Sequence, residues 1–356
     1  MRRSNLLYGL GWDDQREHEL SKWPRDMTPG RVLAEHRGAY SVLAARGQLW
    51  AHLTGRLRHE AESRADLPAT GDWVVVEVHD GNRASIHAVL PRRTKFSRNI
   101  AGKATDEHVL AANVDVSFLV ASLEHEVNIR RIERYLTLAW SGGTDPVVVL
   151  TKSDLAGDPE DIVYELQRVE SVALGVPVLL TSSATGAGIE DVRDVLAGGR
   201  TGVLLGSSGV GKSSLVNALV GDETQQVDTV RSDGKGRHTT SRRELIPVPG
   251  GGVLVDTPGL RGLKMWADGD GMENAFADVT ELSLDCKFND CRHETEPGCA
   301  VLYAIAEGAL QEERLHDWRK LQRELEYQRS KQDQRLALRR RQHWKKIENS
   351  VRQVSW

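Results

Sequence analysis

The stretch "GSSGVGKSS", residues 206–214, matches the phosphate-binding pattern G-x-x-x-x-G-K-[ST] in full. Apolar "GVLL" precedes it and "SLVNALVG" overlaps its end, which predicts a strand, turn and helix rather than an ordinary Gly/Ser turn. In such a loop the backbone N–H groups face the α- and β-phosphates of a nucleotide, Lys212 reaches the β- and γ-phosphates, and the Ser213 hydroxyl binds Mg²⁺. The predicted nucleotide contacts are Gly206, Ser207, Ser208, Gly209, Val210, Gly211, Lys212, Ser213 and Ser214.

Two downstream motifs are typical of the other parts of such a site. "GGVLVDTPGL", residues 251–260, reads as an apolar strand ending in DTPG, a Walker B or switch II sequence. Asp256 is predicted to hold Mg²⁺, and the Gly259 N–H to contact the γ-phosphate. Between the motifs, "GKGRHTTS" offers Thr239 and Thr240 as alternative switch I ligands for the metal.

A base-reading loop is predicted upstream, at "VVVLTKSDL", residues 147–155. The Asp154 carboxylate can accept hydrogen bonds from guanine N1–H and the 2-amino group, whereas ATP would leave it unpaired. Lys152 is expected to lie along the base, with Thr151 and Ser153 completing the loop. Taken alone, TKSD is better explained as a Thr/Asp turn that begins a helix. The later turn "TSSAT" favours base recognition, because its Ser183-Ala184 pair follows the next strand and is predicted to direct an N–H at guanine O6.

The motifs occur in the order base loop, Ser-Ala turn, phosphate loop, switch I and switch II. We interpret this order as a circular permutation, in which new termini open at a surface connection while the same loops surround the same ligand. Apolar strands alternating with amphipathic helices from about residue 114 predict an α/β domain with a mainly parallel sheet. Switch II then leads directly into the C-terminal region, along which a γ-phosphate-dependent movement could pass.

Composition divides the chain into four segments. Residues 1–30 are polar and are expected to form an N-terminal tail. Residues 31–96 hold short alternating runs separated by Gly and charged clusters, which predict a small all-β barrel or sandwich; the pattern alone fits an SH3-like barrel equally well. Residues 97–265 contain the nucleotide motifs, and residues 266–356 contain the cysteines and a long helical region.

All three cysteines lie in "DCKFNDCRHETEPGCA", residues 285–300. Cys286, Cys291, His293 and Cys299 form C-x4-C-x-H-x5-C, a ligand set for tetrahedral zinc. Four protein ligands leave no position for water, so one structural Zn²⁺ that supports local folding is expected. Three free buried cysteines are the competing interpretation, and the clustering of every cysteine beside a histidine argues against it.

Basic charge is concentrated near the C-terminus, although the 356-residue chain carries a net charge of -4. Residues 329–346 contain eight Lys or Arg residues and one acidic residue, with Trp344 available to stack on a base. A solvated helix face is the competing explanation. The candidate RNA contacts are Arg335, Arg339, Arg340, Arg341, Lys345 and Lys346.

The remaining composition indicates a cytoplasmic protein with no membrane association. No apolar run approaches the length needed to cross a bilayer, and the first twenty residues lack the apolar stretch of a signal peptide. Three cysteines are too few for a disulfide framework, which agrees with a reducing compartment.

The permuted order, with "GSSGVGKSS", "GRHTT" and "DTPG", resembles the RsgA (YjeQ) family of ribosome small-subunit-dependent GTPases over most of the chain. "GDWVVV" and "VLPRRTKFSR" resemble the end of that family's N-terminal barrel, an OB-fold, and "AANVDV" resembles the entry to its GTPase domain. The resemblance implies a cytoplasmic late-assembly factor that binds the 30S subunit and its 16S rRNA, with GTP hydrolysis stimulated by the subunit. A monomer and the same zinc ligands are expected.

Two features bear on activity. Thr151 stands where the base loop usually has Asn, which removes an amide that ties this loop to the phosphate loop; selectivity should survive through Asp154 while affinity falls. Leu260 follows DTPG, as in the family, and an apolar side chain cannot orient water, so slow intrinsic turnover is expected. His238 is a candidate water-positioning residue, and a structural or RNA-facing His is equally compatible.

The leading prediction is therefore a GTPase that yields GDP and phosphate and acts in late 30S biogenesis. Lys212, Ser213 and Asp256 are the predicted catalytic groups, assisted by Mg²⁺. One alternative is an RNA-binding module, built from the OB barrel and zinc cluster, whose nucleotide site is mainly regulatory; the intact phosphate loop argues against it. Another is an ATP-dependent kinase or ATPase, against which Asp154 argues.

Overall fold

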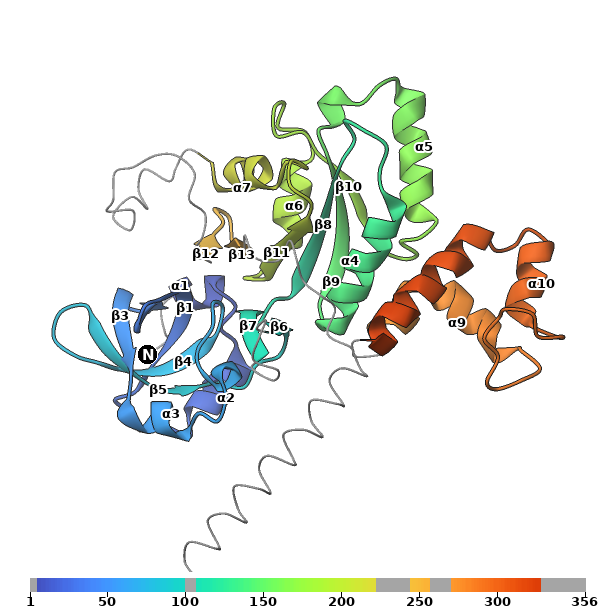
Figure 1. The fold of residues 1–356 in the computed structure, drawn as a ribbon. Helices are drawn as coiled ribbons and strands as arrows, with labels where there is room; N and C mark the ends of the chain where they lie inside the picture. The colour runs from blue at the N-terminus through green and yellow to red at the C-terminus, as the bar shows by residue number, and fades with distance from the viewer. Residues whose placement is uncertain (1–4, 100–106, 222–243, 257–269, 328–356) are drawn as a thin grey trace, which may run out of the picture.

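The computed structural model describes residues 5–99, 107–221, 244–256 and 270–327, and Figure 1 shows three units along the chain. An N-terminal barrel is followed by a central sheet with helices on both faces and then by a helical C-terminal module. The barrel and the C-terminal module lie on opposite sides of the central domain. Among the described residues, no helix is both long enough and apolar enough for a membrane crossing.

The barrel is closed by five strands. They are β1 (Thr28–His36), β2 (Ala39–Ala44), β3 (Gly47–Leu53), β4 (Trp73–Val78) and β5 (Arg83–Val89). Their order is β1-β2-β3-β5-β4, with β3 parallel to β5. Alternate side chains such as Val42, Val74 and Ile86 fill the interior, as the alternating sequence pattern predicts. This five-stranded barrel is an OB-fold, which excludes the SH3-like alternative.

The residues before the barrel are helical and packed, which differs from the expected N-terminal tail. α1 (Asn5–Gly9) and α2 (Asp14–Leu20) flank a turn that buries Leu10 and Trp12. The Trp12 ring meets the edge of the barrel's Trp73 at 4.8 Å between centroids. A few well-placed apolar side chains anchor this segment although its overall composition is polar.

Arg31 on β1 lies where the barrel, the N-terminal turn and the central domain meet. Its guanidinium donates to the carbonyls of Gly71 (2.8 Å), Leu10 (2.5 Å) and Asn113 (3.0 Å) and to the Thr201 hydroxyl (3.0 Å). The side chain is 1% exposed and packs over the Trp73 ring. Burial lowers the pKa of Arg31 to about 10, so it stays charged at neutral pH. One cation therefore holds three parts of the chain together.

The central sheet has the order β10-β9-β8-β11-β13-β12. Its strands are β8 (Val116–Ser122), β9 (Asp145–Thr151), β10 (Val178–Leu180), β11 (Thr201–Gly206), β12 (Glu244–Pro247) and β13 (Val253–Asp256). β12 is antiparallel to β13, and the other neighbours are parallel. β11 lies inside the sheet, between the strands that precede it in the chain and those that follow it, as a permuted domain requires. A hairpin of β6 (Lys95–Asn99) and β7 (Glu107–Ala112) leads into this sheet from the barrel.

Helices cover both faces of the sheet. α4 (Ile129–Ser141) and α5 (Pro159–Glu170) bury Val148 and Leu150 of β9 on one face, and α6 (Ile189–Val195) and α7 (Lys212–Val220) bury Val147 and Val149 on the other. Successive strand residues point to opposite faces, so a strand covered on both sides needs a continuous apolar run. The run "VVVL" in β9 is continuously apolar because helices cover both faces of this strand.

One buried arginine connects the C-terminal module to α4, in addition to the more exposed ion pairs Arg130–Asp317 and Arg134–Glu324. The module contains α8 (Asp270–Ala275), α9 (Ala277–Leu284), α10 (Ala300–Ala306) and a helical stretch over residues 312–327. Arg314, 6% exposed, donates to Glu133 of α4 (2.5 Å), to both carboxylate oxygens of Asp278 (2.9 Å) and to the Ala275 carbonyl (2.8 Å). Its guanidinium also lies 4.3 Å from the centre of the Phe276 ring. The end of α8, the start of α9 and the face of α4 therefore share one buried cation.

Replacement of Arg31 by Met tests the junction between barrel and central domain. We expect Arg31→Met to lower the free energy of unfolding by about 3 kcal/mol, because several buried oxygens lose their donor. Urea denaturation followed by tryptophan fluorescence measures this, since Trp73 packs against Arg31. The exposed Arg37→Met is the matched control and should change stability by less than about 0.5 kcal/mol. Equal stability of the two variants would contradict the assigned role.

Candidate nucleotide site and zinc centre

The phosphate loop joins β11 to α7 as its sequence predicts. Gly209 and Gly211 have φ angles of 85° and 89°, a backbone region that favours glycine, and α7 begins at Lys212. The Lys212 ammonium donates to the carbonyls of Gly206 (2.8 Å) and Ser207, which hold it over the loop. The loop thus places a cation and the N-terminal N–H groups of a nine-residue helix at one turn, the arrangement that binds phosphate groups.

The predicted base loop lies at the end of β9, and its carboxylate is oriented by a residue that the sequence analysis missed. Asp154 accepts a hydrogen bond of 2.5 Å from the Ser182 hydroxyl. Ser182 is fully buried, and its Oγ in turn accepts the Thr185 N–H at 3.2 Å. Ser182 is the second residue after β10 and directly precedes the predicted Ser183-Ala184 pair, so a hydroxyl next to that pair was the available signal. The two loops therefore meet through Asp154.

Thr151 ties the base loop to the phosphate loop. Its hydroxyl lies 2.6 Å from the Val210 carbonyl oxygen and 3.0 Å from that of Ala121, and its side chain is buried. A hydroxyl carries one hydrogen, and the shorter distance favours donation to Val210. A Cβ on Gly211 would lie 3.2 Å from the Thr151 Oγ1, so the two loops approach closely at this glycine. The replacement of Asn by Thr was expected to remove the contact between the base loop and the phosphate loop. In the structure the Thr151 hydroxyl makes this contact in place of the amide.

Lys152 adopts a left-handed backbone conformation, with φ of 58°. Its ammonium forms an ion pair with Glu124, which follows β8. The stem of Lys152 thus spans the ends of β8 and β9, beside Asp154, where it was predicted to support the base.

Several predicted residues lie outside the described part of the chain. They are His238, Thr239 and Thr240 of switch I, Gly259 of switch II and the basic residues Arg335, Arg339, Arg340, Arg341, Lys345 and Lys346. Asp256 is the last residue of β13, and only its backbone is described. β13 is the immediate neighbour of β11, so Asp256 and the phosphate loop share one edge of the sheet.

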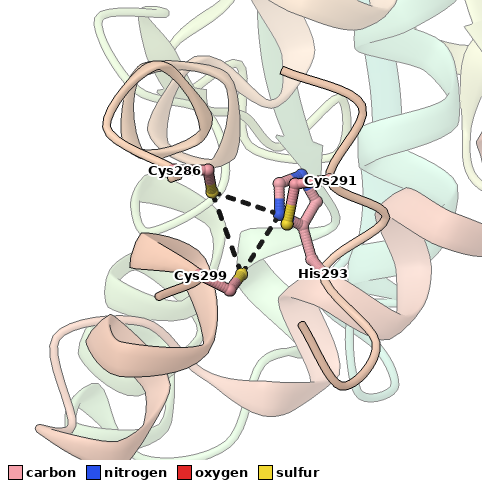
Figure 2. Close-up of side chains that lie close together, drawn as sticks. All are labelled: Cys286, Cys291, His293 and Cys299. Carbon is pink, nitrogen blue, oxygen red and sulfur yellow. Dashed lines mark hydrogen bonds between the residues drawn. The ribbon is translucent and has the colours of Figure 1, made fainter. Parts of the chain in front are cut away.

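The zinc ligands predicted from sequence converge, as Figure 2 shows. The distances are 3.6 Å from Cys286 Sγ to His293 Nδ1, 3.3 Å from His293 Nδ1 to Cys299 Sγ and 3.9 Å between the Cys286 and Cys299 sulfurs. All four candidate ligand atoms, including that of Cys291, lie within 4.8 Å of one another. Tetrahedral zinc, with bonds of about 2.3 Å to sulfur and about 2.0 Å to nitrogen, separates its ligands by about 3.5–3.8 Å. The cluster therefore fits a zinc ion.

Local contacts hold the zinc ligands in place. The His293 ring meets the edge of Trp318 at 5.4 Å, and its carbonyl accepts a hydrogen bond from Arg319. Cys299 is the N-cap of α10 and accepts the Leu302 N–H on its sulfur at 3.4 Å. These contacts link the cluster to α10 and to the helical stretch over residues 312–327.

The sheet order, phosphate loop and base loop define a circularly permuted P-loop GTPase. The family model for the RsgA GTPase matches residues 89–266, and a model described as a 50S ribosome-binding GTPase matches residues 201–340. The chain belongs to the RsgA GTPase family and is a GTP hydrolase. This membership confirms the resemblance that the motifs indicated.

Relatives match nearly the whole chain. The small ribosomal subunit biogenesis GTPase RsgA of Streptomyces coelicolor is 45% identical and covers 96% of this chain and 93% of its own length. The protein of the same name from Opitutus terrae is 45% identical, with coverage of 96% and 95%. The crystal structure of YjeQ from Thermotoga maritima superposes with a TM-score of 0.64 at 28% identity, covering 84% of this chain and 98% of its own. YloQ, a circularly permuted GTPase, shares the fold, with a TM-score of 0.62 at 24% identity and coverage of 85% and 96%.

The loop tie at Thr151 leads to a direct test. We expect Thr151→Val, which keeps the shape and removes the hydroxyl, to raise the dissociation constant for GDP about tenfold, because the Val210 carbonyl loses its donor. Titration with a fluorescent GDP analogue measures this. Thr151→Ser keeps the hydroxyl and should stay within about threefold of the parent. Identical affinities for all three proteins would show that the tie does not support binding.

Metal analysis tests the zinc centre. We expect about one zinc ion per chain in the purified protein, and Cys291→Ser should lose most of it, because a site with three protein ligands binds zinc less tightly. Atomic emission spectroscopy gives the metal content. Glu294→Gln, an exposed change in the same loop, should keep the zinc. A parent protein without zinc, or full occupancy in Cys291→Ser, would refute the assignment.

Proposed function

We propose that this chain is a GTP-driven switch in the assembly of the small ribosomal subunit, and that the subunit stimulates its GTP hydrolysis. The observation that carries the proposal is the joined nucleotide site, in which Thr151 connects the guanine-reading loop to the phosphate loop. The relatives that match nearly the whole chain carry the name small ribosomal subunit biogenesis GTPase RsgA. The nucleotide site supports GTP hydrolysis as the reaction, and the names of the relatives support the small ribosomal subunit as the partner.

Within this proposal, the chain's own residues bind and orient GTP. Asp154, held by Ser182, accepts the guanine N1–H and 2-amino groups, while the N–H groups from Gly209 to Ser213 surround the phosphates. Lys212 stabilises charge that develops on the β- and γ-phosphate oxygens. Ser213, Asp256 and either Thr239 or Thr240 would hold Mg²⁺, which neutralises phosphate charge when bound.

The intrinsic reaction is expected to be slow. Leu260 follows the DTPG sequence, and its apolar side chain has no group that can position water. We assign His238 as the residue that orients water once a partner has placed switch I. A site that needs a partner to position the attacking water agrees with a switch that hydrolyses GTP when it is bound to the assembled subunit.

The fold offers a route by which the nucleotide state could reach the partner. Residues 257–260 of switch II precede α8 in the chain, and α8 packs against α4. The end of α8 shares Arg314 with α4 and α9. A displacement of switch II would thus act on α8, the first helix of the C-terminal module that carries the Cys/His cluster.

The proposed contacts with the partner lie in particular parts of the chain. We divide it into an N-terminal segment (1–30), an RNA-binding barrel (31–96), the GTPase domain (97–265) and a zinc-binding helical domain (266–356). The C-terminal basic residues, from Arg335 to Lys346, would bind phosphates of 16S rRNA. We propose a cytoplasmic monomer that engages one 30S subunit.

The decisive experiment is GTP hydrolysis with purified 30S subunits, with 50S subunits and alone. We expect 30S subunits to raise the rate by about tenfold or more, because a partner that completes a GTPase site gives large accelerations. Lys212→Ala should abolish the stimulated rate, and ATP should not be hydrolysed.

The other possible results of this experiment distinguish between the candidate functions. Stimulation by 50S and not by 30S would favour the activity suggested by the family model that describes a 50S ribosome-binding GTPase. GTP binding with no stimulation by either subunit would overturn the proposed partner and leave the GTPase assignment intact. Stimulated hydrolysis that survives Lys212→Ala would place the activity outside this site.

A further inference from the structure

Large apolar side chains are exposed on the outer side of α5. Val163 is 52% exposed, Tyr164 is 60% exposed and Leu174 is 52% exposed. The helical turns continue past the end of α5, because the Ala173 N–H donates to the Val169 carbonyl at 2.9 Å. At 3.6 residues per turn, Leu174 therefore lies on the same side as Val163. We call this side the α5 face, which consists of Glu160, Val163, Tyr164, Gln167, Glu170 and Leu174.

The opposite side of α5 accounts for the packing of this helix on the sheet. Leu166, Val169 and Val172 contact the hydrophobic core, and Val169 is fully buried. This inner side gives the helix the apolar stripe that it needs to pack on the sheet. Folding therefore does not require apolar residues on the α5 face, and exposed apolar side chains gathered on one face are typical of an interaction site.

Acidic residues surround these apolar side chains. Residues 158–174 contain five acidic residues and one basic residue, a net charge of -4 that equals the net charge of the whole chain. The basic residue, Arg168, is already paired with Glu165 at 3.0 Å and with Glu126 at 2.9 Å. Glu160 and Glu170 are exposed and form no ion pair within the described part of the chain. The α5 face therefore presents negative charge that the protein itself does not neutralise.

The α5 face lies at the edge of the central domain opposite to the barrel. α5 leads into β10, the edge strand of the central sheet, whereas β12 at the other edge contacts β1 of the barrel. Figure 1 shows α5 on the outer side of the central domain, away from the barrel. A partner on the α5 face thus does not displace the barrel.

We propose that the α5 face binds a basic polypeptide segment of a partner protein, with an apolar side chain of that segment against Val163 and Tyr164. Charge decides among the occupants, because RNA phosphates, anionic lipids and the α5 face of a second copy are all repelled by Glu160 and Glu170. Lysine and arginine pair with these carboxylates, and their aliphatic stems cover apolar surface. Proteins that bind nucleic acid carry such basic segments. This inference deepens the proposed function by adding a protein contact to the RNA contacts, and it rests on that function for the source of the segment.

Fluorescence anisotropy of the full chain with GDP bound tests the proposal. The probe is a labelled peptide of about fourteen residues, built from lysine and leucine with the leucines at helical spacing. We expect Tyr164→Ala to weaken binding about tenfold, because exposed aromatic residues are typical anchors of interfaces. Glu160→Lys combined with Glu170→Lys should weaken binding about tenfold or more, with the larger effect at low salt. A peptide with serine in place of every leucine should bind the parent about tenfold more weakly, since it lacks the apolar anchor.

The matched controls lie on the C-terminal module. Tyr303→Ala removes a 68% exposed aromatic from α10, and Glu281→Lys combined with Glu312→Lys makes the same change in net charge at exposed positions. Both controls should bind the peptide within about twofold of the parent.

Two results overturn the proposal: no binding of the peptide by the parent, or equal losses in the control variants and the α5 variants. Loss of RNA binding in Tyr164→Ala also overturns it, because the α5 face would then hold a nucleic acid. Peptide binding by a parent whose GTP hydrolysis is not stimulated by 30S subunits overturns the proposed function alone, so the two failures are distinguishable.

Discussion

The parallel pairing of β11 with β8 is the constraint on which the nucleotide site depends. It runs from Gly202 opposite Val116 to Gly206 opposite Val120, and it joins two segments that a conventional order would place the other way round. The carboxyl ends of parallel strands meet at one edge, so the loops after β8, β9 and β11 converge there. The approach is close enough that a Cβ on Gly206 would lie 2.6 Å from the Val120 carbonyl oxygen. Glycine at this position therefore serves strand packing as well as phosphate binding.

The two outer units are each joined to the GTPase domain through a buried arginine. Arg31 bonds to neutral oxygens at the barrel junction, and Arg314 bonds to Glu133 and Asp278 at the zinc module. A planar guanidinium with five donors can bridge several elements at fixed angles, which a lysine ammonium cannot do. Such junctions are directional, so they set the orientation of the modules as well as their attachment. The C-terminal module, which carries the Cys/His cluster, begins with α8, the element that follows switch II in the chain.

Local motifs were predictable where one short stretch contains the whole chemical requirement. The phosphate loop and the Cys/His cluster are of this kind, because their ligating groups lie within a few residues and their spacing is diagnostic. The Ser182–Asp154 and Thr151–Val210 bonds were not predictable, because they join turns whose proximity depends on strand order. The packing of α1 and α2 was also missed, since burial of Trp12 depends on a barrel surface supplied by Trp73.

The sequence by itself determined the class of fold, the permuted order, the nucleotide type and the Cys/His cluster that fits a zinc ion. These follow from residue types at fixed local spacing, and from apolar periods that reflect burial on one or two faces. Only the tertiary structure decided the OB topology of the barrel, the partner of Asp154, the replacement tie at Thr151 and the arginine junctions. Each of these joins residues distant in the chain, and their contact depends on strand order and register, which local spacing does not encode.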